Sequence, residues 1–205
     1  MYRKLSALGL AILFLTLLAC SKTSITDTWK EPSFQGGPIN DVLVLAVGKD
    51  QVARRNYEEN FVKALAARGV KAYPTYKYLA DDPVKKEDIQ ALIRRLGIKY
   101  VLITSLVGVE KETQYHPPRT YVAPRMGRGM GYYGYYYRSY DVVHEPGYYT
   151  TNVLVQLETV LYDAKTAKQI WIAHSRTMNP NSASDVIKSV IPELVDAMKE
   201  AGLIL

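Results

Sequence analysis

Cysteine is almost absent from this chain of 205 residues, which contains only Cys20. A single cysteine cannot form an intramolecular disulfide, so we expect the hydrophobic core alone to stabilise the fold. Zinc sites built from several cysteines are likewise excluded. The three histidines, His116, His144 and His174, are far apart in the sequence and belong to no metal-binding motif. We therefore predict no metal site and no cofactor.

Familiar catalytic motifs are also missing. The chain has no GxSxG motif of hydrolases, and neither GxGxxG nor GxxxxGK[ST], which bind phosphates. Glu58-Glu59 and Arg54-Arg55 are neighbours within an expected helix, where adjacent side chains point apart. We interpret both pairs as solvent-exposed charge, and we expect that the protein is not an enzyme.

A competing interpretation places a small-ligand site or a hydrolytic site at one β-to-α turn. Gly48, Lys49 and Asp50 follow the first buried strand, where α/β proteins often bind nucleotides, and Arg54 lies in the next helix. No phosphate-binding motif surrounds these residues, which favours an ordinary β-to-α turn over a phosphate site.

The chain has one long hydrophobic run, and it lies at the N-terminus. The run Leu5–Leu18 follows Arg3 and Lys4. It is shorter than the roughly 20 residues that a transmembrane helix needs. A short basic segment followed by a short apolar one is typical of a secretory signal peptide, which we predict to be residues 1–19.

The end of this run, Leu17-Leu18-Ala19-Cys20, resembles the lipobox of bacterial lipoprotein precursors. The resemblance implies cleavage before Cys20 and attachment of fatty acyl chains, palmitate among them, to this residue. Several acyl chains suffice for stable membrane anchoring. Since Ser21 follows the cysteine and Asp does not, the resemblance implies the outer membrane, facing the periplasm or the cell surface. The alternative is a simple secretory signal with a chance cysteine.

The segment that follows Cys20 lacks apolar periodicity. Residues 20–40 contain Ser, Thr, Pro and Gly-Gly, a composition typical of linkers. We predict a lipid-anchored tether here, with Trp29 docking loosely on the folded domain.

Residues 41–205 have the pattern of a single α/β domain. Removal of residues 1–19 leaves 26 − 2 = 24 basic residues against 20 acidic ones, too small an excess to indicate nucleic-acid binding. Right-handed crossovers predict a five-stranded mixed sheet of order 2-1-3-4-5 with three helices, α+β-like in its second half. The expected strands are Val42–Val47, Val70–Tyr76, Ile98–Val109, Asn152–Tyr162 and Gln169–Thr177, and the helices begin near Asp50, near Pro83 and after Ser182.

A long connection, residues 116–149, separates the third and fourth expected strands. Together with Tyr115 it holds ten of the seventeen tyrosines, most densely in GMGYYGYYYRSY at 129–140. One interpretation is a low-complexity extension of a β-hairpin. The other is a surface for a partner protein, since Tyr and Arg are enriched in interfaces, with a glycan as second candidate. The residues of this expected partner-binding surface are Tyr132, Tyr133, Tyr135, Tyr136, Tyr137, Arg138 and Tyr140.

Four stretches of residues 41–204 are similar to a broad group of small bacterial outer-membrane lipoproteins. They are DVLVLAVGKD, FVKALAARGVKAYP, LGIKYVLITSLVGVEKE and VLVQLETVLYDAKTAKQIWIAHSRT. The α/β domain of this group resembles that of the curli-export lipoprotein family and the N-terminal domain of the Tol-system propeller protein. The tyrosine-rich connection departs from the pattern.

The resemblance implies a lipid-anchored, periplasmic binding or assembly module of the cell envelope that contacts another envelope protein without catalysis. A structural lipoprotein that contacts peptidoglycan is a further alternative, beside the small-ligand or hydrolytic site described above.

The lipobox predicts the mass of the mature protein. We expect material purified from its native host to lack residues 1–19 and to carry acyl chains on Cys20. Intact-mass spectrometry measures both changes, and Cys20→Ala should abolish them. A chain that retains Met1, or that has a free thiol at position 20, would contradict the predicted anchor.

Overall fold

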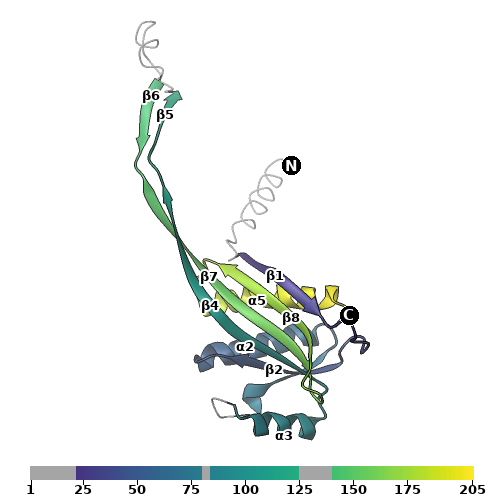
Figure 1. Ribbon diagram of the computed structural model, residues 1–205. Coiled ribbons are helices and arrows are strands. Elements are labelled where there is room, and N and C mark those ends of the chain that lie inside the picture. Colours follow the sequence, from purple (N-terminus) through teal and green to yellow (C-terminus); the bar gives the residue numbers. More distant parts are fainter. Residues whose placement is uncertain (1–21, 80–83, 125–139) are drawn as a thin grey trace, which may run out of the picture. The chain divides into compact units, whose positions relative to one another are not determined.

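The computed structural model describes residues 22–79, 84–124 and 140–205 (Figure 1). This part of the chain divides into two compact units. The α/β unit comprises the residues up to Glu110 and those from Leu154 onwards, and the ribbon unit comprises Lys111–Val153. The division falls near the limits of the tyrosine-rich connection expected from the sequence.

A six-stranded mixed sheet forms the centre of the α/β unit, with the strand order β1-β8-β7-β4-β2-β3. β2 is parallel to β3 and β4, whereas β8 is antiparallel to β1 and β7. The elements are β1 (Lys22–Lys30), β2 (Asp41–Val47), α2 (Gln51–Ala66), β3 (Lys71–Pro74), the 3-10 turn η1 (Thr75–Lys77), α3 (Lys86–Leu96), β4 (Tyr100–His116), β7 (Tyr148–Asp163), β8 (Gln169–Met178) and α5 (Ala183–Glu200).

The prediction of a mixed α/β domain with three helices is confirmed, but the prediction of five strands is wrong. β1 is a sixth strand, added at the end of the sheet beside β8, whereas the other five strands lie in the predicted relative order. β1 falls within residues 20–40, so the expected tether is wrong for this stretch. Its main chain pairs with β8 from Lys22↔Met178 to Lys30↔Trp171, and this antiparallel pairing stabilises a strand that is mostly polar.

The residues between β1 and β2 are also held against the fold. The backbone N–H of Glu31 donates to the carbonyl of Ile170 at 2.8 Å, and that of Ile39 donates to the carbonyl of Leu203 at 2.7 Å. Phe34 packs edge-on against Tyr100, with ring centroids 6.3 Å apart. The covalent path from β1 to β2 is therefore part of the folded unit.

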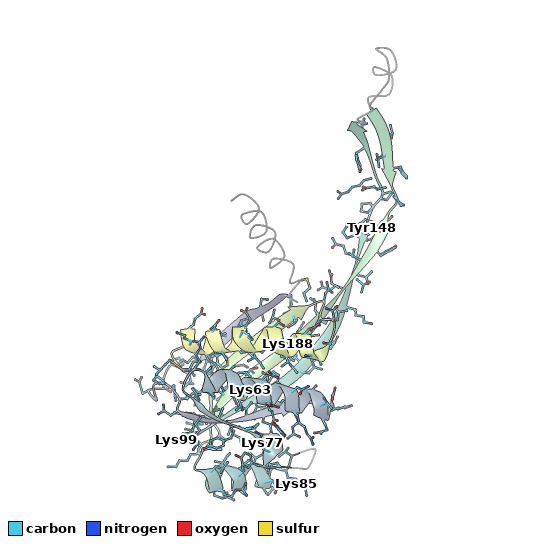
Figure 2. The ribbon with its side chains drawn as sticks, turned by 180° about the vertical axis from the view of Figure 1, so that it is seen from behind. Lys63, Lys77, Lys85, Lys99, Tyr148 and Lys188 are labelled. Carbon is cyan, nitrogen blue, oxygen red and sulfur yellow. The ribbon has the colours of Figure 1, made fainter. Side chains whose placement is uncertain are left out.

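Two helices cover one face of the sheet. α2 packs against α5 and against β2 and β3, and α5 packs against β1 and β8. Figure 2, seen from behind, shows both helices in front of the sheet, with the labelled Lys63 on α2 and Lys188 on α5. Large, fully buried side chains of this layer are Phe61, Leu102, Trp171, Leu194 and Met198.

The opposite face is covered only in part. Leu92 of α3 packs with Leu43 of β2 and Val101 of β4 in a second, smaller core, and Figure 1 shows α3 at the lower end of the unit. Over β1, β8 and β7 this face carries more accessible side chains. Trp29 is 43% exposed, and the side chain of His174 is 40% exposed.

Local signals in the sequence explain where the helices begin and end. The Asp50 carboxylate accepts hydrogen bonds from the backbone N–H groups of Val52 and Ala53, which caps α2. The Ser182 hydroxyl caps α5 in the same way by accepting from the N–H of Asp185. α3 ends at Gly97, whose φ of +66° is accessible to glycine at little steric cost.

The buried position of Leu102 on β4 predicts a large effect of truncation. Leu102→Ala should lower the free energy of unfolding by about 3 kcal/mol, because it leaves a cavity between the sheet and its helices. Val52, which is 67% exposed on α2, provides the control, and Val52→Ala should change the free energy by less than about 0.5 kcal/mol. Denaturant titrations followed by circular dichroism measure both values. Equal losses would contradict the described core.

Candidate interaction surfaces

The turn that follows β2 and the start of α2 contain the residues considered for a small-ligand site. Two of them, Asp50 and Arg54, make contacts within the folded chain. Asp50 caps α2. Arg54 is only 5% exposed and turns inward. Lys49 is exposed to solvent. Arg54 is thus not available as an exposed ligand-binding group, and its expected place on the solvent-exposed helix surface is wrong.

Arg54 points toward Glu58, which is completely buried. The Nε of Arg54 donates to Glu58 Oε1 at 3.2 Å. The same oxygen accepts from the Thr75 hydroxyl at 2.6 Å and from the backbone N–H of Ala46 at 3.1 Å. Glu58 Oε2 accepts from the N–H of Tyr76 at 2.8 Å. This carboxylate therefore connects α2 to the end of β2 and to η1. The prediction that Glu58 is solvent-exposed is wrong.

Three hydroxyl groups form a second buried network beside it. The Tyr57 hydroxyl lies 2.9 Å from that of Thr104, which lies 3.0 Å from that of Thr159. Burial raises the pKa of Tyr57 far above its usual value, although the hydrogen bonds to Thr104 and Thr159 act in the opposite direction. Tyr57 is therefore neutral at any physiological pH and acts here as a packing and hydrogen-bonding group.

The histidines lie at separate places in the described chain. His174 on β8 lies 3.1 Å from Glu158 of β7 and 3.9 Å from Asp27 of β1. His116 hydrogen-bonds the hydroxyl of Thr150 at 3.0 Å, and His144 that of Thr120 at 2.8 Å. Residues 22–79, 84–124 and 140–205 contain no group of three His, Cys, Asp or Glu side chains that could hold a metal ion.

One depression of the α/β unit lies where β1 ends and β7 turns into β8. Its volume is about 770 Å³, and Trp29, Phe34 and Ile172 supply apolar lining. Hydrogen bonds from the Ser33 side chain and backbone lower the pKa of Glu31 at its rim. Hydrogen bonds from Thr166 lower that of Asp163 on the other side. Both carboxylates are charged near neutral pH, and each is already bonded to its own turn.

A second depression follows β1 along its length. Its volume is about 610 Å³, and it is lined by Thr23–Thr28 together with Glu193, Asp196, Ala197 and Glu200 of α5. This groove was not predicted, because residues 20–40 were expected to form a tether. The acidic residues of α5 recur at intervals of three and four, and this helical spacing is the sequence signal that could have located one of its walls.

The ribbon unit contains the outer part of β4, the start of β7, and a two-stranded antiparallel sheet of β5 (Arg119–Pro124) and β6 (Tyr140–Glu145). Val122 pairs with Val142, and these residues are 60% and 71% exposed. Tyr149 is 71% exposed although its ring lies 4.8 Å from that of Tyr115. The unit thus presents apolar and aromatic side chains to solvent.

One residue of the predicted tyrosine surface lies in a described strand. Tyr140 begins β6 and pairs with Pro124. Cys20 and the predicted signal peptide lie outside the described residues. The same holds for most of the predicted partner-binding surface, namely Tyr132, Tyr133, Tyr135, Tyr136, Tyr137 and Arg138. Tyr148 of the ribbon unit, labelled in Figure 2, was not among the predicted residues. Its ring stacks on that of His116 with centroids 4.7 Å apart.

Within the described residues, each helix is too short or too polar to span a membrane. No family profile matches the sequence, and no curated protein matches it either.

Several solved structures are distantly similar. A PelC dodecamer from Paraburkholderia phytofirmans, in a form with one substitution, matches with a TM-score of 0.47 and 13% identity over 85% of this chain and 96% of its own. Lipoprotein GNA1162 from Neisseria meningitidis matches with a TM-score of 0.40 and 16% identity over 78% of this chain and 99% of its own. A PDZ domain protein from Parabacteroides distasonis matches with a TM-score of 0.37 and 10% identity over 92% of this chain and 39% of its own.

The buried ion pair predicts a strong asymmetry between two adjacent glutamates. Glu58→Ala should lower the free energy of unfolding by about 3–5 kcal/mol, because it leaves Arg54 buried without a counter-charge. Glu59 forms an exposed pair with Lys63 at 2.9 Å, and Glu59→Ala should cost less than about 0.5 kcal/mol.

A double variant tests whether the unpaired charge of Arg54 causes this loss of stability. Arg54→Met with Glu58→Met removes both charges and should be less destabilising than Glu58→Ala alone. Denaturant titration of the three variants measures the differences. Equal stability of Glu58→Ala and Glu59→Ala would contradict the described network.

Proposed function

We propose that this protein is a lipid-anchored, non-enzymatic binding or assembly lipoprotein of the cell envelope. It faces the periplasm from the outer membrane and contacts another envelope protein, without binding nucleic acid. The observation that carries the proposal is the exposed apolar and aromatic surface of the ribbon unit.

A two-stranded ribbon is at best marginally stable in water by itself. β5 and β6 pair with each other in a sheet of two strands, so each has one edge free of strand pairing in the described chain. Exposed valine and tyrosine side chains add apolar area beside these edges, and large exposed apolar patches are typical of interaction sites. A protein partner would cover both the apolar side chains and an open edge.

The lipid anchor supports the compartment. The lipobox resemblance places the acyl chains on Cys20, which would keep the ribbon unit close to other envelope proteins. The non-enzymatic part of the proposal draws support from the turn after β2, where Asp50 and Arg54 are bonded within the fold.

Deletion of most of the ribbon tests the proposal. A chain lacking residues 119–147 should lose its partner in a pull-down after crosslinking in living cells, because the deletion removes β5, β6 and the tyrosine segment. Val52→Ser, an exposed change on α2, serves as the matched control and should keep the partner. Acylation of Cys20 is measured in parallel, so that loss of anchoring is not mistaken for loss of binding. Unchanged partner capture by the deletion variant would defeat this role for the ribbon.

A further inference from the structure

The outer edge of β1 is a strand edge beside a helix. β1 stands at the end of the six-stranded sheet and pairs with β8 on one side. Six consecutive residues, Thr23–Thr28, line the groove of about 610 Å³ between this strand and α5. Because neighbouring residues of a strand point to opposite faces, a lining of consecutive residues means that the groove follows the edge of the main chain. The geometry offers a place for one more strand.

The helical wall of this groove is acidic. Glu193, Asp196 and Glu200 of α5 all line it. Asp27 of β1 adds a fourth carboxylate, with 74% of its side chain exposed. No Lys or Arg side chain belongs to the described lining.

Two of these four carboxylates lie near a basic side chain. Asp27 lies 3.9 Å from His174. Asp196 pairs with Arg68 at 3.0 Å, but the Asp196 side chain is 64% exposed, and such pairs contribute little to stability. Among the residues that the structure describes, Glu193 and Glu200 have no ion-pair partner. The groove therefore combines an open strand edge with negative charge that is free to attract a cation.

We propose that this groove binds an extended segment of another envelope protein, rich in Lys and Arg, as a seventh strand of the sheet. Main-chain hydrogen bonds to β1 would supply affinity, and basic side chains facing α5 would supply specificity. This inference deepens the proposed function and rests on it for the compartment of the partner. It concerns a different surface from the ribbon unit.

The charge of the groove argues against a second copy of β1 as the occupant. Pairing two β1 edges would bring the carboxylates of Asp27, Glu193 and Glu200 from one chain close to the same groups of the other. Like charges brought together at an interface are strongly unfavourable. Natural proteins use charged edges in this way to prevent self-association, so the acidic wall selects a basic occupant and rejects its own copy.

A β-bulge at Thr26 restricts the register. The pairing of β1 with β8 shifts between Ile25 and Asp27, and the Thr26 hydroxyl donates to the carbonyl of His174 at 3.2 Å. A bulge bends its strand and interrupts regular pairing. The incoming strand would therefore pair in two short runs, one along 22–25 and one along 27–30.

Short synthetic peptides test the chemistry of the occupant. The probe is a fluorescent peptide of alternating Lys and Val, added to the purified, acylated full chain in detergent and followed by anisotropy. A Glu-Val peptide and a Lys-Val peptide methylated at alternate backbone nitrogens are the comparisons. We expect the Lys-Val peptide to bind more weakly as salt rises, and the other two to bind roughly tenfold or more weakly than it does.

Two double variants locate the site. Glu193→Lys with Glu200→Lys should weaken binding of the Lys-Val peptide by roughly tenfold, because attraction becomes repulsion. Glu59→Lys with Glu87→Lys makes the same change of charge on the exposed surfaces of α2 and α3 and should leave the affinity within about twofold. Thermal unfolding verifies that each variant is folded. If the groove variant does not fold, Glu193→Gln with Glu200→Gln takes its place and should also weaken binding.

Four results would overturn the inference. Three concern peptide binding: absence of Lys-Val binding, equal binding of the methylated peptide, and equal affinity of the groove and control variants. Sedimentation that shows self-association blocked by the peptide would assign the groove to a second copy and also overturn it. Cys20 acylation and partner capture through the ribbon are separate measurements. A peptide that fails to bind an acylated chain refutes the groove alone, whereas an unacylated chain refutes the proposed anchor alone.

Discussion

The buried carboxylate of Glu58 is the interaction on which the α/β unit most depends. Removing a charge from water is expensive, and it is tolerated only where opposite charge and hydrogen bonds compensate it. Glu58 meets this condition through Arg54 of its own helix, through Ala46 at the end of β2, and through Thr75 and Tyr76 of η1. A shift of α2 by one residue would break these bonds together. The network therefore fixes the helix on the sheet, and α5 packs against the helix so placed.

The same network limits the chemistry available after β2. In open α/β sheets this end of the parallel strands is where ligands usually bind. Here Arg54 bonds to Glu58 and Asp50 caps α2, which leaves Lys49 as the exposed charge of this turn. The hydroxyl groups of Tyr57 and Thr104 are hydrogen-bonded to each other. An accessible polar groove lies toward the opposite edge of the sheet, between β1 and α5. The fold thus separates the buried polar residues that stabilise it from the exposed ones that can meet a partner.

Hydrophobic periodicity was enough to predict much of this fold, because most of its elements bury a stripe or a face. It found the strands corresponding to β2, β3, β4, β7 and β8, and the stripe of α5. It missed β1, since KTSITDTWK has no apolar periodicity, and such a strand depends on pairing with β8.

The sequence alone also could not predict which charged side chains are buried. Arg54 and Glu58 have the same i, i+4 spacing as Glu59 and Lys63, yet the first pair is buried and the second exposed. Contacts of Glu58 with Ala46, Thr75 and Tyr76, all outside α2, distinguish the two pairs. The pairing of β5 with β6 is similarly a long-range event, joining Arg119 to Glu145 across the tyrosine segment.

The position of β1 changes what the expected lipid anchor would do. If Cys20 carries the acyl chains, Ser21 alone separates it from Lys22, where β1 begins. At about 3.5 Å per residue, the strand starts within roughly 10 Å of the lipidated residue. A spacer of twenty residues would let the domain move freely above the bilayer, whereas this connection holds one end of β1 at its surface. A partner strand that pairs with β1 must then come from a protein with a segment at the same surface, and the short connection raises its effective concentration there. With such an anchor, the proposed attachment and the proposed docking would meet at the same end of the chain, at β1.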